Sequence, residues 1–167
     1  MLILQHPLEV AHAKNSGRLL HLCLPNSRLV VGEVFDAADA AVLPDKVTVL
    51  LYPPETSEGH AVPAPWPDNA TQPLTNLRLV VLDATWRKSR KMLHVSPWLQ
   101  RLPRFALAGL HVSGYSIRKA HRPGQLSSLE ATCLALMQLE ADPAGLQPLL
   151  QGFAGFVAQR QAFQNAI

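Results

Sequence analysis

The sequence predicts an α/β fold in which a mainly parallel sheet is flanked by helices. Strand-like and helix-like segments alternate along the chain, and the strand-like segments are continuous apolar runs, which is typical of parallel strands buried on both faces. The 167 residues are 48% hydrophobic and 16% charged, which excludes a disordered or solvating chain. The length fits one domain, which we expect to span residues 1–167.

The expected elements follow from apolar runs and from the turn residues between them. Strands are expected where short apolar runs are bounded by proline or polar residues, at 2–5, 28–34, 47–52, 77–82 and 104–107. Helices are expected where apolar residues recur at helical spacing or alanine dominates, at 36–43, 86–94, 127–139 and 143–163, with a single turn at 9–14. Asn15-Ser16-Gly17 is a turn signal, and the apolar segment 18–24 ends at Pro25.

Proline and glycine mark the connections. Residues 53–73 hold six prolines, so a long loop is expected there, of the kind that is usually functional. Further connections are expected between Pro97 and Pro103 and over 109–125. Ligands of parallel sheets bind beyond the carboxyl ends of the strands. We therefore expect three segments to meet at that edge: 52–53, 83–86 and the loop after Leu107.

Several classes of protein are excluded by what the sequence lacks. No apolar run approaches the roughly 18 residues of a membrane span, so no membrane association is expected, and residues 1–5 lack the basic flank of a signal peptide. Cys23 and Cys133 are far apart and form no CxxC pair, so a reducing cytoplasm is expected. The histidines show no metal-ligand spacing, and nucleotide-binding glycine motifs and nucleophile elbows are missing. We expect no metal.

Charge is divided unevenly between the two halves of the chain. Residues 1–82 carry five Lys/Arg and eight Asp/Glu (−3), whereas residues 83–167 carry ten and four (+6), and these sum to the net charge of +3. No acid lies between Asp83 and Glu130, where nine basic residues fall: Arg87, Lys88, Arg90, Lys91, Arg101, Arg104, Arg118, Lys119 and Arg122. Such a segment indicates a polyphosphate or nucleic-acid partner. A solvated basic face is the alternative, but ordinary surfaces intersperse both signs.

The expected helix 86–94 concentrates this charge. Four basic residues share one face at spacing i, i+3, i+4, i+7: Arg87, Arg90, Lys91 and His94. Their mutual repulsion disfavours the helix, so a phosphate backbone explains them better than helix stability does. Trp86, Ser89 and Leu93 share another face, which we expect to point inward.

Asp83 ends an apolar strand and precedes a helix, where backbone N–H groups favour an anion. A helix N-cap is the structural alternative for it. Thr85 and Trp86 follow, either as a second cap and a core aromatic or as groups that contact a ligand, the indole covering a flat ring. Downstream, Ser127 and Glu130 have capping-box spacing, yet Glu130 is the only acid of a long basic region and fits a polar ligand contact. His6 before Pro7 is expected to be structural.

At these residues the sequence resembles the DTW-domain family. The resemblance rests on an ordered set of motifs between residue 2 and about 140: Leu4-Gln5-His6-Pro7-x-Glu9, Asn15-Ser16-Gly17-Arg18-Leu19, Leu51-Tyr52-Pro53, Asp83-Ala84-Thr85-Trp86-Arg87, Tyr115-x-x-Arg118-Lys119 and Ser127-Ser128-Leu129-Glu130-Ala131. It implies a SPOUT-like α/β fold with a C-terminal trefoil knot. It also implies a tRNA-uridine aminocarboxypropyltransferase, which moves the 3-amino-3-carboxypropyl group of S-adenosylmethionine (SAM) onto N3 of a uridine and releases methylthioadenosine.

The resemblance assigns roles to residues of this chain. Asp83 would take the N3 proton or orient the nucleophile. The donor would be held by Ser16, Leu51, Tyr52, Thr85, Trp86, Leu107, Ser128 and Glu130, with the apolar and aromatic groups framing the adenosine and methylthio end. Phosphates of the RNA would be held by Arg87, Lys88, Arg90, Lys91, Arg118, Lys119 and Arg122. The loop 53–73 would serve as a lid or as an RNA contact.

Two departures and one absence distinguish this chain from the family pattern. Ser16 stands where threonine is usual, and Ser128 replaces a threonine as it does in a related branch that modifies rRNA. Many bacterial relatives carry an N-terminal cysteine cluster suggestive of zinc, and this chain begins after that region. Other functions stay open: a SPOUT-type RNA methyltransferase with the same cofactor, a non-catalytic RNA-binding domain, and less readily a nucleotide hydrolase. A monomer is expected.

Overall fold

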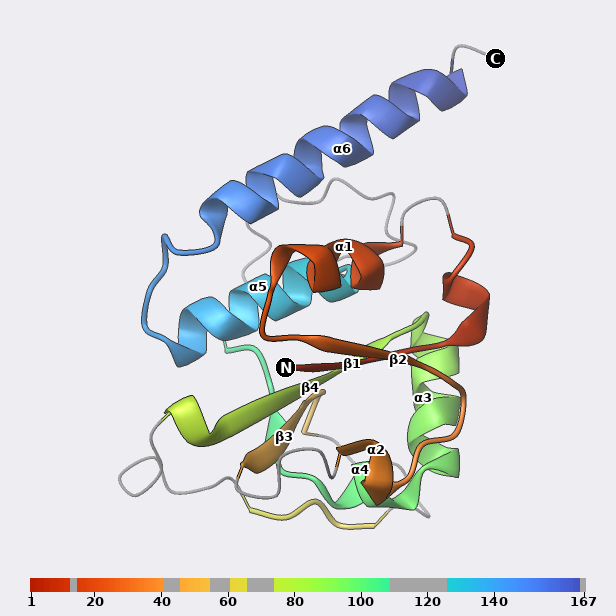
Figure 1. The fold of residues 1–167 in the computed structure, drawn as a ribbon, viewed down its shortest axis with the longest axis vertical. Helices are drawn as coiled ribbons and strands as arrows, with labels where there is room; N and C mark the ends of the chain where they lie inside the picture. The colour runs from red at the N-terminus through yellow and green to blue at the C-terminus, as the bar shows by residue number, and fades with distance from the viewer. Residues whose placement is uncertain (13–14, 41–45, 55–60, 66–73, 109–125, 166–167) are drawn as a thin grey trace. The chain divides into compact units, whose positions relative to one another are not determined.

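The computed structural model describes the chain except residues 13–14, 41–45, 55–60, 66–73, 109–125 and 166–167 (Figure 1). The chain forms two compact units, Met1–Ala106 and Leu107–Ile167. The first unit contains a five-stranded sheet with the order β2-β1-β4-β3-β5. Every strand pair in it is parallel, so the prediction of a parallel sheet flanked by helices is confirmed.

The strands of the first unit occupy the apolar runs of the sequence. They are β1 (Leu2–Gln5), β2 (Arg28–Val31), β3 (Val47–Leu51), β4 (Leu77–Asp83) and β5 (Arg104–Phe105). The short helices and turns between them are η1 (Pro7–Glu9), α1 (Ser16–Cys23), α2 (Ala37–Ala40), η2 (Leu74–Asn76), α3 (Trp86–Val95) and α4 (Pro97–Arg101). β2 and β5 are shorter than expected, and they are the two edge strands, which have a neighbour on one side only.

Alternation along the strands divides the sheet into two faces. Leu4, Leu50 and Leu82 point to one face and pack with Met92 of α3 and Leu99 of α4. The other face is covered in this unit by α1, whose first turn meets the end of β4. Figure 1 shows α1 on one side of the sheet, with α3 and α4 on the other. The carboxyl ends of β1 and β4 are level, because Gln5 is aligned with Asp83.

Two local expectations for the first unit are wrong, and a third differs in its bounds. The segment 97–103 was expected to be a connection, but Pro97 begins α4, since the fixed φ of proline suits the first turn of a helix. The turn signal at residues 15–17 is the start of α1: Asn15 caps the helix by accepting the N–H of Arg18 at 2.8 Å. The turn expected at 9–14 is preceded by a 3-10 helix over Pro7–Glu9, and the hydrogen bond from the His12 N–H to the Glu9 carbonyl continues it, whereas residues 13–14 lie outside the described part of the chain.

The second unit contains two helices, α5 (Ser128–Leu139) and α6 (Gln147–Asn165). α5 begins where the sequence predicts. α6 begins at Gln147, inside the segment 143–163 expected to hold it, and the Asp142 carboxylate accepts the N–H groups of Ala144 and Gly145 and holds a turn before it. None of the described helices combines the length and apolar character needed to cross a membrane.

Candidate functional site

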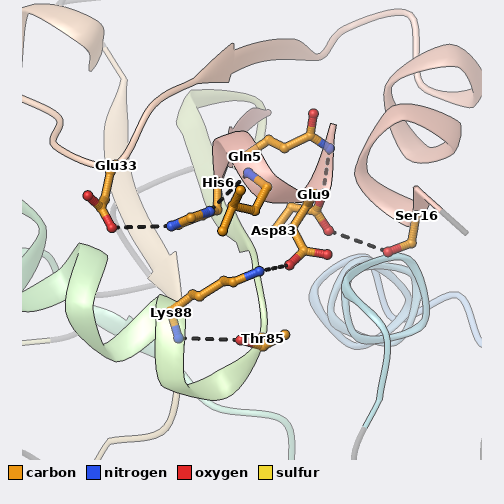
Figure 2. Close-up of polar contacts among 9 residues, drawn as sticks. Gln5, His6, Glu9, Ser16, Glu33, Asp83, Thr85 and Lys88 are labelled. Atoms are coloured by element: carbon orange, nitrogen blue, oxygen red, sulfur yellow. Dashed lines mark hydrogen bonds and ion pairs between the residues drawn. The ribbon is translucent and has the colours of Figure 1, made fainter. Parts of the chain in front are cut away.

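Asp83 lies at the carboxyl end of β4, with only 4% of its surface exposed. Its Oδ2 accepts a hydrogen bond from Gln5 Nε2 at 2.7 Å, and its Oδ1 accepts one from the Ser16 hydroxyl at 3.4 Å (Figure 2). The N-cap of α3 is Thr85, whose Oγ1 accepts the N–H of Lys88 at 3.4 Å. The capping interpretation is therefore correct for Thr85 and wrong for Asp83. The buried carboxylate is held by side chains from two other elements.

Gln5 is the residue that links Asp83 to the start of α1. One amide proton of Gln5 Nε2 goes to Asp83, and the group also donates to Asn15 Oδ1 at 2.7 Å. Asn15 is fixed in turn, because the same Oδ1 caps α1 and its amide donates to the Val10 carbonyl at 3.0 Å. Sequence reasoning missed the roles of Gln5 and Asn15. The one signal available in the sequence was the polar residue Gln5 at the end of an apolar run, and the structure shows that its side chain is buried.

Gly17 allows the carboxylate to lie against the first turn of α1. A Cβ at this position would collide with the Asp83 carboxyl group. The N-terminal end of a helix carries partial positive charge from its unpaired N–H groups, so an anion is stabilised there. Gln5, Ser16 and Gly17 together fix the position and orientation of Asp83, and we refer to these four residues with Asn15 as the Asp83 cluster.

Next to this cluster, two acids from other parts of the chain pair with lysines of α3. Figure 2 shows the pair of Glu9 with Lys88 and the contact of Glu33 with His6. Glu9 pairs with Lys88 at 2.8 Å, and Glu33 pairs with Lys91 at 2.9 Å and with His6 Nε2 at 3.2 Å. His6 is structural as expected, because its Nδ1 accepts the N–H of Leu8 and thereby caps η1. The hydrogen bond from Lys91, followed by that from His6, lowers the pKa of Glu33 below its ordinary value.

The basic face of α3 is exposed, as the spacing predicts. However, acids from elsewhere in the chain lie beside this basic helix, because Glu9 pairs with Lys88 and Glu33 pairs with Lys91. Among the residues that the structure describes, Arg87 and Arg90 have no ion pair. The expectation that Trp86, Ser89 and Leu93 all point inward is wrong for the indole: Ser89 and Leu93 are buried, whereas Trp86 is 45% exposed.

Two aromatic side chains lie at the same carboxyl-terminal end of the sheet as Asp83, but on its other face. The rings of Tyr52 and Trp86 meet edge to face with centroids 5.8 Å apart. The Arg104 guanidinium lies over the Tyr52 ring, with Cζ 5.1 Å from its centroid. Tyr52 and Trp98 pack against the core on the α3 side. Two residues expected to hold the donor, Tyr52 and Trp86, are thus brought together, but on the face opposite to Asp83 and Ser16.

Tyr52, Trp98 and Arg104 carry unusual polar atoms. Within the described part of the chain, four buried side-chain nitrogen or oxygen atoms have no hydrogen-bond partner: Tyr52 Oη, Trp98 Nε1, Arg104 Nε and Arg104 Nη1. Burial lowers the pKa of the Arg104 guanidinium. We call Tyr52, Trp98 and Arg104 the unpaired cluster. Sequence reasoning counted Arg104 only as one basic residue among nine, because unpaired atoms are visible only in three dimensions.

The remaining predicted site residues have no described contact with Asp83 or with the Tyr52–Trp86 pair. Leu51 ends β3 and is aligned with Phe105 of β5. Leu107, Ser128 and Glu130 belong to the second unit, which is described by itself. Ser127 and Glu130 form a complete capping box: Glu130 Oε2 accepts the Ser127 N–H at 2.8 Å, and Ser127 Oγ accepts the Glu130 N–H at 3.2 Å. Arg118, Lys119 and Arg122, with most of the loop 53–73, lie outside the described residues.

Comparison with known proteins gives a consistent result. A family model described as the DTW domain matches residues 1–161. A protein of Drosophila melanogaster named tRNA-uridine aminocarboxypropyltransferase 2 is 34% identical over 158 residues, which cover 90% of this chain and 60% of that protein. A mouse protein of the same name is 30% identical over 156 residues, which cover 89% of this chain and 50% of that protein. No solved structure matches the chain.

Proposed function

Because the chain belongs to the DTW-domain family, we propose that it transfers the 3-amino-3-carboxypropyl group from SAM to N3 of a uridine in tRNA and releases methylthioadenosine. The observation that carries this proposal is the family match over residues 1–161. The names of the two relatives indicate which reaction is meant. The chain spans 50–60% of the length of these relatives.

The residues at the sheet edge fit such a donor. Leu51, the exposed Trp86 indole and the Tyr52 ring at its edge offer a surface for the adenosine and methylthio end, and we assign Leu107 to the same end. Hydrogen bonds would come from Ser16, Thr85, Ser128 and Glu130. Both Ser16 and Thr85 keep capacity for this, since a hydroxyl has one donor and two acceptor sites and each uses one in the fold. When bound, SAM supplies a sulfonium that activates the neighbouring carbon to attack.

Asp83 is proposed to take the N3 proton of uridine. A protonated N3 is a poor nucleophile, so a base at this position has a clear task. The short bond from Gln5 engages Oδ2, whereas the bond of Ser16 to Oδ1 is long. We therefore assign Oδ1 as the oxygen that accepts the N3 proton, while Oδ2 keeps its hydrogen bond with Gln5. Should the proton go elsewhere, the same geometry suits Asp83 to orient the uracil.

The exposed face of α3 is proposed to bind the tRNA backbone. Arg87 and Arg90 carry charges that no described acid neutralises, so we assign the main phosphate contacts to them. Lys88 and Lys91 would contribute less, because a phosphate must compete there with Glu9 and Glu33. Arg118, Lys119 and Arg122, which lie outside the described residues, are also proposed to hold phosphates.

Two finer features also belong to the proposal. The family suggests that the α/β fold is SPOUT-like with a C-terminal trefoil knot. A cytoplasmic location is supported by the sequence, in which Cys23 and Cys133 are far apart and form no CxxC pair.

The test uses the purified chain, unmodified tRNA and two labelled forms of SAM. One form carries the label in the methyl group and the other in the carboxypropyl arm. The proposal predicts that label enters RNA only from the carboxypropyl arm. Methyl label in RNA would make the protein a methyltransferase, and binding of tRNA without transfer of either label would favour a non-catalytic RNA-binding domain.

A further inference from the structure

The unpaired cluster contains polar groups that the free protein leaves without partners. All four such buried atoms in the described residues belong to Tyr52, Trp98 and Arg104. A buried N–H group without an acceptor loses its hydrogen bonds to water and gains nothing in return, so it destabilises the folded state. Three of the four atoms are nitrogen donors that cannot accept. The cluster therefore lacks an acceptor.

The missing acceptor is best supplied as an anion. A guanidinium stays protonated even when burial lowers its pKa, so Arg104 brings a positive charge together with its donors. Among the described residues, no carboxylate forms an ion pair with Arg104, and the ion pairs of Glu9 and Glu33 join them to other partners. The Tyr52 ring supports the guanidinium through a cation–π contact but offers it no acceptor.

The position of Arg104 relates this missing anion to the proposed donor. Arg104 contacts Tyr52, and Tyr52 contacts the exposed Trp86, so the three side chains form a continuous row at the sheet edge. If Tyr52 and Trp86 frame the adenosine and methylthio end, Arg104 lies one ring away from it. SAM carries a single anionic group, the carboxylate of the arm that is transferred. A carboxylate that docks on either edge of the guanidinium gives a partner to Nε or to Nη1.

We propose that Arg104 binds the carboxylate of the aminocarboxypropyl arm and thereby positions this arm for transfer. This inference rests on the proposed function, because it needs SAM as the donor. Arg104 then acts as a specificity-determining residue: it distinguishes SAM from analogues of the same nucleoside that lack the carboxylate. It also explains why the free protein keeps an unpaired guanidinium, since the ligand completes the hydrogen bonding.

Calorimetric titration with three compounds tests the proposal. SAM, decarboxylated SAM and methylthioadenosine share the adenosine and the sulfur, but only SAM has the carboxylate. The wild-type protein is expected to bind SAM about tenfold to hundredfold more tightly than decarboxylated SAM, as for a hydrogen-bonded charged pair. Arg104→Met should remove this preference and leave the affinity for methylthioadenosine unchanged. The matched control is Arg101→Gln, at an exposed arginine three residues earlier, which should behave like the wild type.

A second measurement separates binding from a structural role. Arg104→Met replaces an unpaired guanidinium by an apolar side chain of similar length, so its melting temperature should equal or exceed that of the wild type. A lower melting temperature with an unchanged preference for SAM would show that Arg104 is a structural residue and would overturn the proposal. If Arg104→Met does not fold, the comparison within the wild-type protein decides. An equal affinity of the wild type for SAM and for decarboxylated SAM contradicts the proposal.

The failure of this inference differs from that of the proposed function. Wild-type protein that binds SAM and methylthioadenosine, with Arg104→Met binding both as well as the wild type, overturns the role of Arg104 alone. Loss of both ligands by the variant would place Arg104 at the adenosine and likewise contradict the proposal. Wild-type protein that binds none of the three compounds would overturn the donor assignment and the role of Arg104 together.

Discussion

The two faces of one sheet edge differ in how completely their polar groups are paired. In the Asp83 cluster, Gln5, Asn15 and Ser16 connect the buried carboxylate to the start of α1 by hydrogen bonds of 2.7–3.4 Å. In the unpaired cluster, four buried polar atoms of Tyr52, Trp98 and Arg104 have no partner among the described residues. Both groups lie in the first unit, where Asp83 ends β4 and Tyr52 follows the carboxyl end of β3.

The difference suggests a division of tasks. A catalytic group needs a fixed position before the substrate arrives, and the Asp83 cluster provides this through neighbours that are themselves held. A ligand-binding group gains affinity from hydrogen bonds that only the ligand completes, which is why unpaired donors persist in a folded protein. The free protein loses stability through this arrangement. Removal of a polar group should therefore lower the free energy of unfolding in the Asp83 cluster but leave it unchanged or raise it in the unpaired cluster.

The largest effects on stability are expected in the Asp83 cluster, first of all at Gly17. Gly17→Ala would place a methyl group against the Asp83 carboxylate, and overpacking of this kind costs about 1–3 kcal/mol. The measurement is the free energy of unfolding in urea, together with transfer activity, which should fall because Asp83 must move. The control is Gly152→Ala in α6, where nothing lies within 4 Å of the new Cβ. That change should stabilise by about 0.5–1 kcal/mol.

Gln5 and Tyr52 provide the sharpest test of the contrast itself. Gln5→Met removes the donor that Asp83 and Asn15 share and should cost about 1–3 kcal/mol. Tyr52→Phe removes a buried hydroxyl without a described partner and should leave stability unchanged or raise it by up to about 1 kcal/mol. Chemical denaturation of both variants measures the two effects. A loss for Tyr52→Phe as large as that for Gln5→Met would contradict the division into paired and unpaired groups.

The same contrast exists on α3, where the lysines are paired and the arginines are not. Replacement of Arg87 and Arg90 by glutamine should reduce the slope of log K against log salt for tRNA binding, by about 0.7–0.9 for each arginine. Lys88→Gln is the matched control and should change the slope little, because Glu9 already neutralises Lys88. Filter binding between low and moderate salt measures both. Equal effects of the three positions would show that the pairing is irrelevant to RNA.

The smallest effect is expected at Glu33. Lys91 and His6 lower the pKa of this carboxylate in the folded protein, so ionised Glu33 stabilises the fold at pH values above the pKa of an ordinary glutamate, about 4.3. This contribution is lost as the pH falls through the lowered pKa. Glu33→Gln should therefore melt slightly below the wild type at neutral pH, and the difference should vanish in acid. A difference that persists at low pH would assign the effect to packing.

The sequence predicts the sheet better than it predicts the site. Continuous apolar runs locate β3 and β4 almost to the residue, because strands buried on both faces must be continuous and apolar. The start of α1 was mistaken for a turn, since Asn, Ser and Gly are typical of turns and of helix N-termini alike. The sequence predicts a connection from Pro97 to Pro103, but proline also suits the first turn of a helix, and Pro97 begins α4.

For the site, the sequence indicates Asp83, Ser16, Tyr52 and Trp86 but not the partners Gln5 and Asn15. Gln5 lies 78 positions from Asp83, and only the alignment of β1 with β4 brings the two together. Glu9 and Glu33 escape notice for the same reason, because charge was counted along the chain and ion pairs form across it. The unpaired atoms of Arg104 have no counterpart in any sequence pattern.

Asp83→Asn tests the central claim most directly. Asparagine has the same shape, and its amide can turn so that its oxygen still accepts from Gln5, so the variant should fold and bind SAM as the wild type does. The account predicts a fall in carboxypropyl transfer to tRNA of about a hundredfold to ten-thousandfold, as for loss of a general base. Unchanged binding of SAM with unchanged transfer would contradict the role of Asp83 and, with it, the assignment of the chemistry to this face of the sheet.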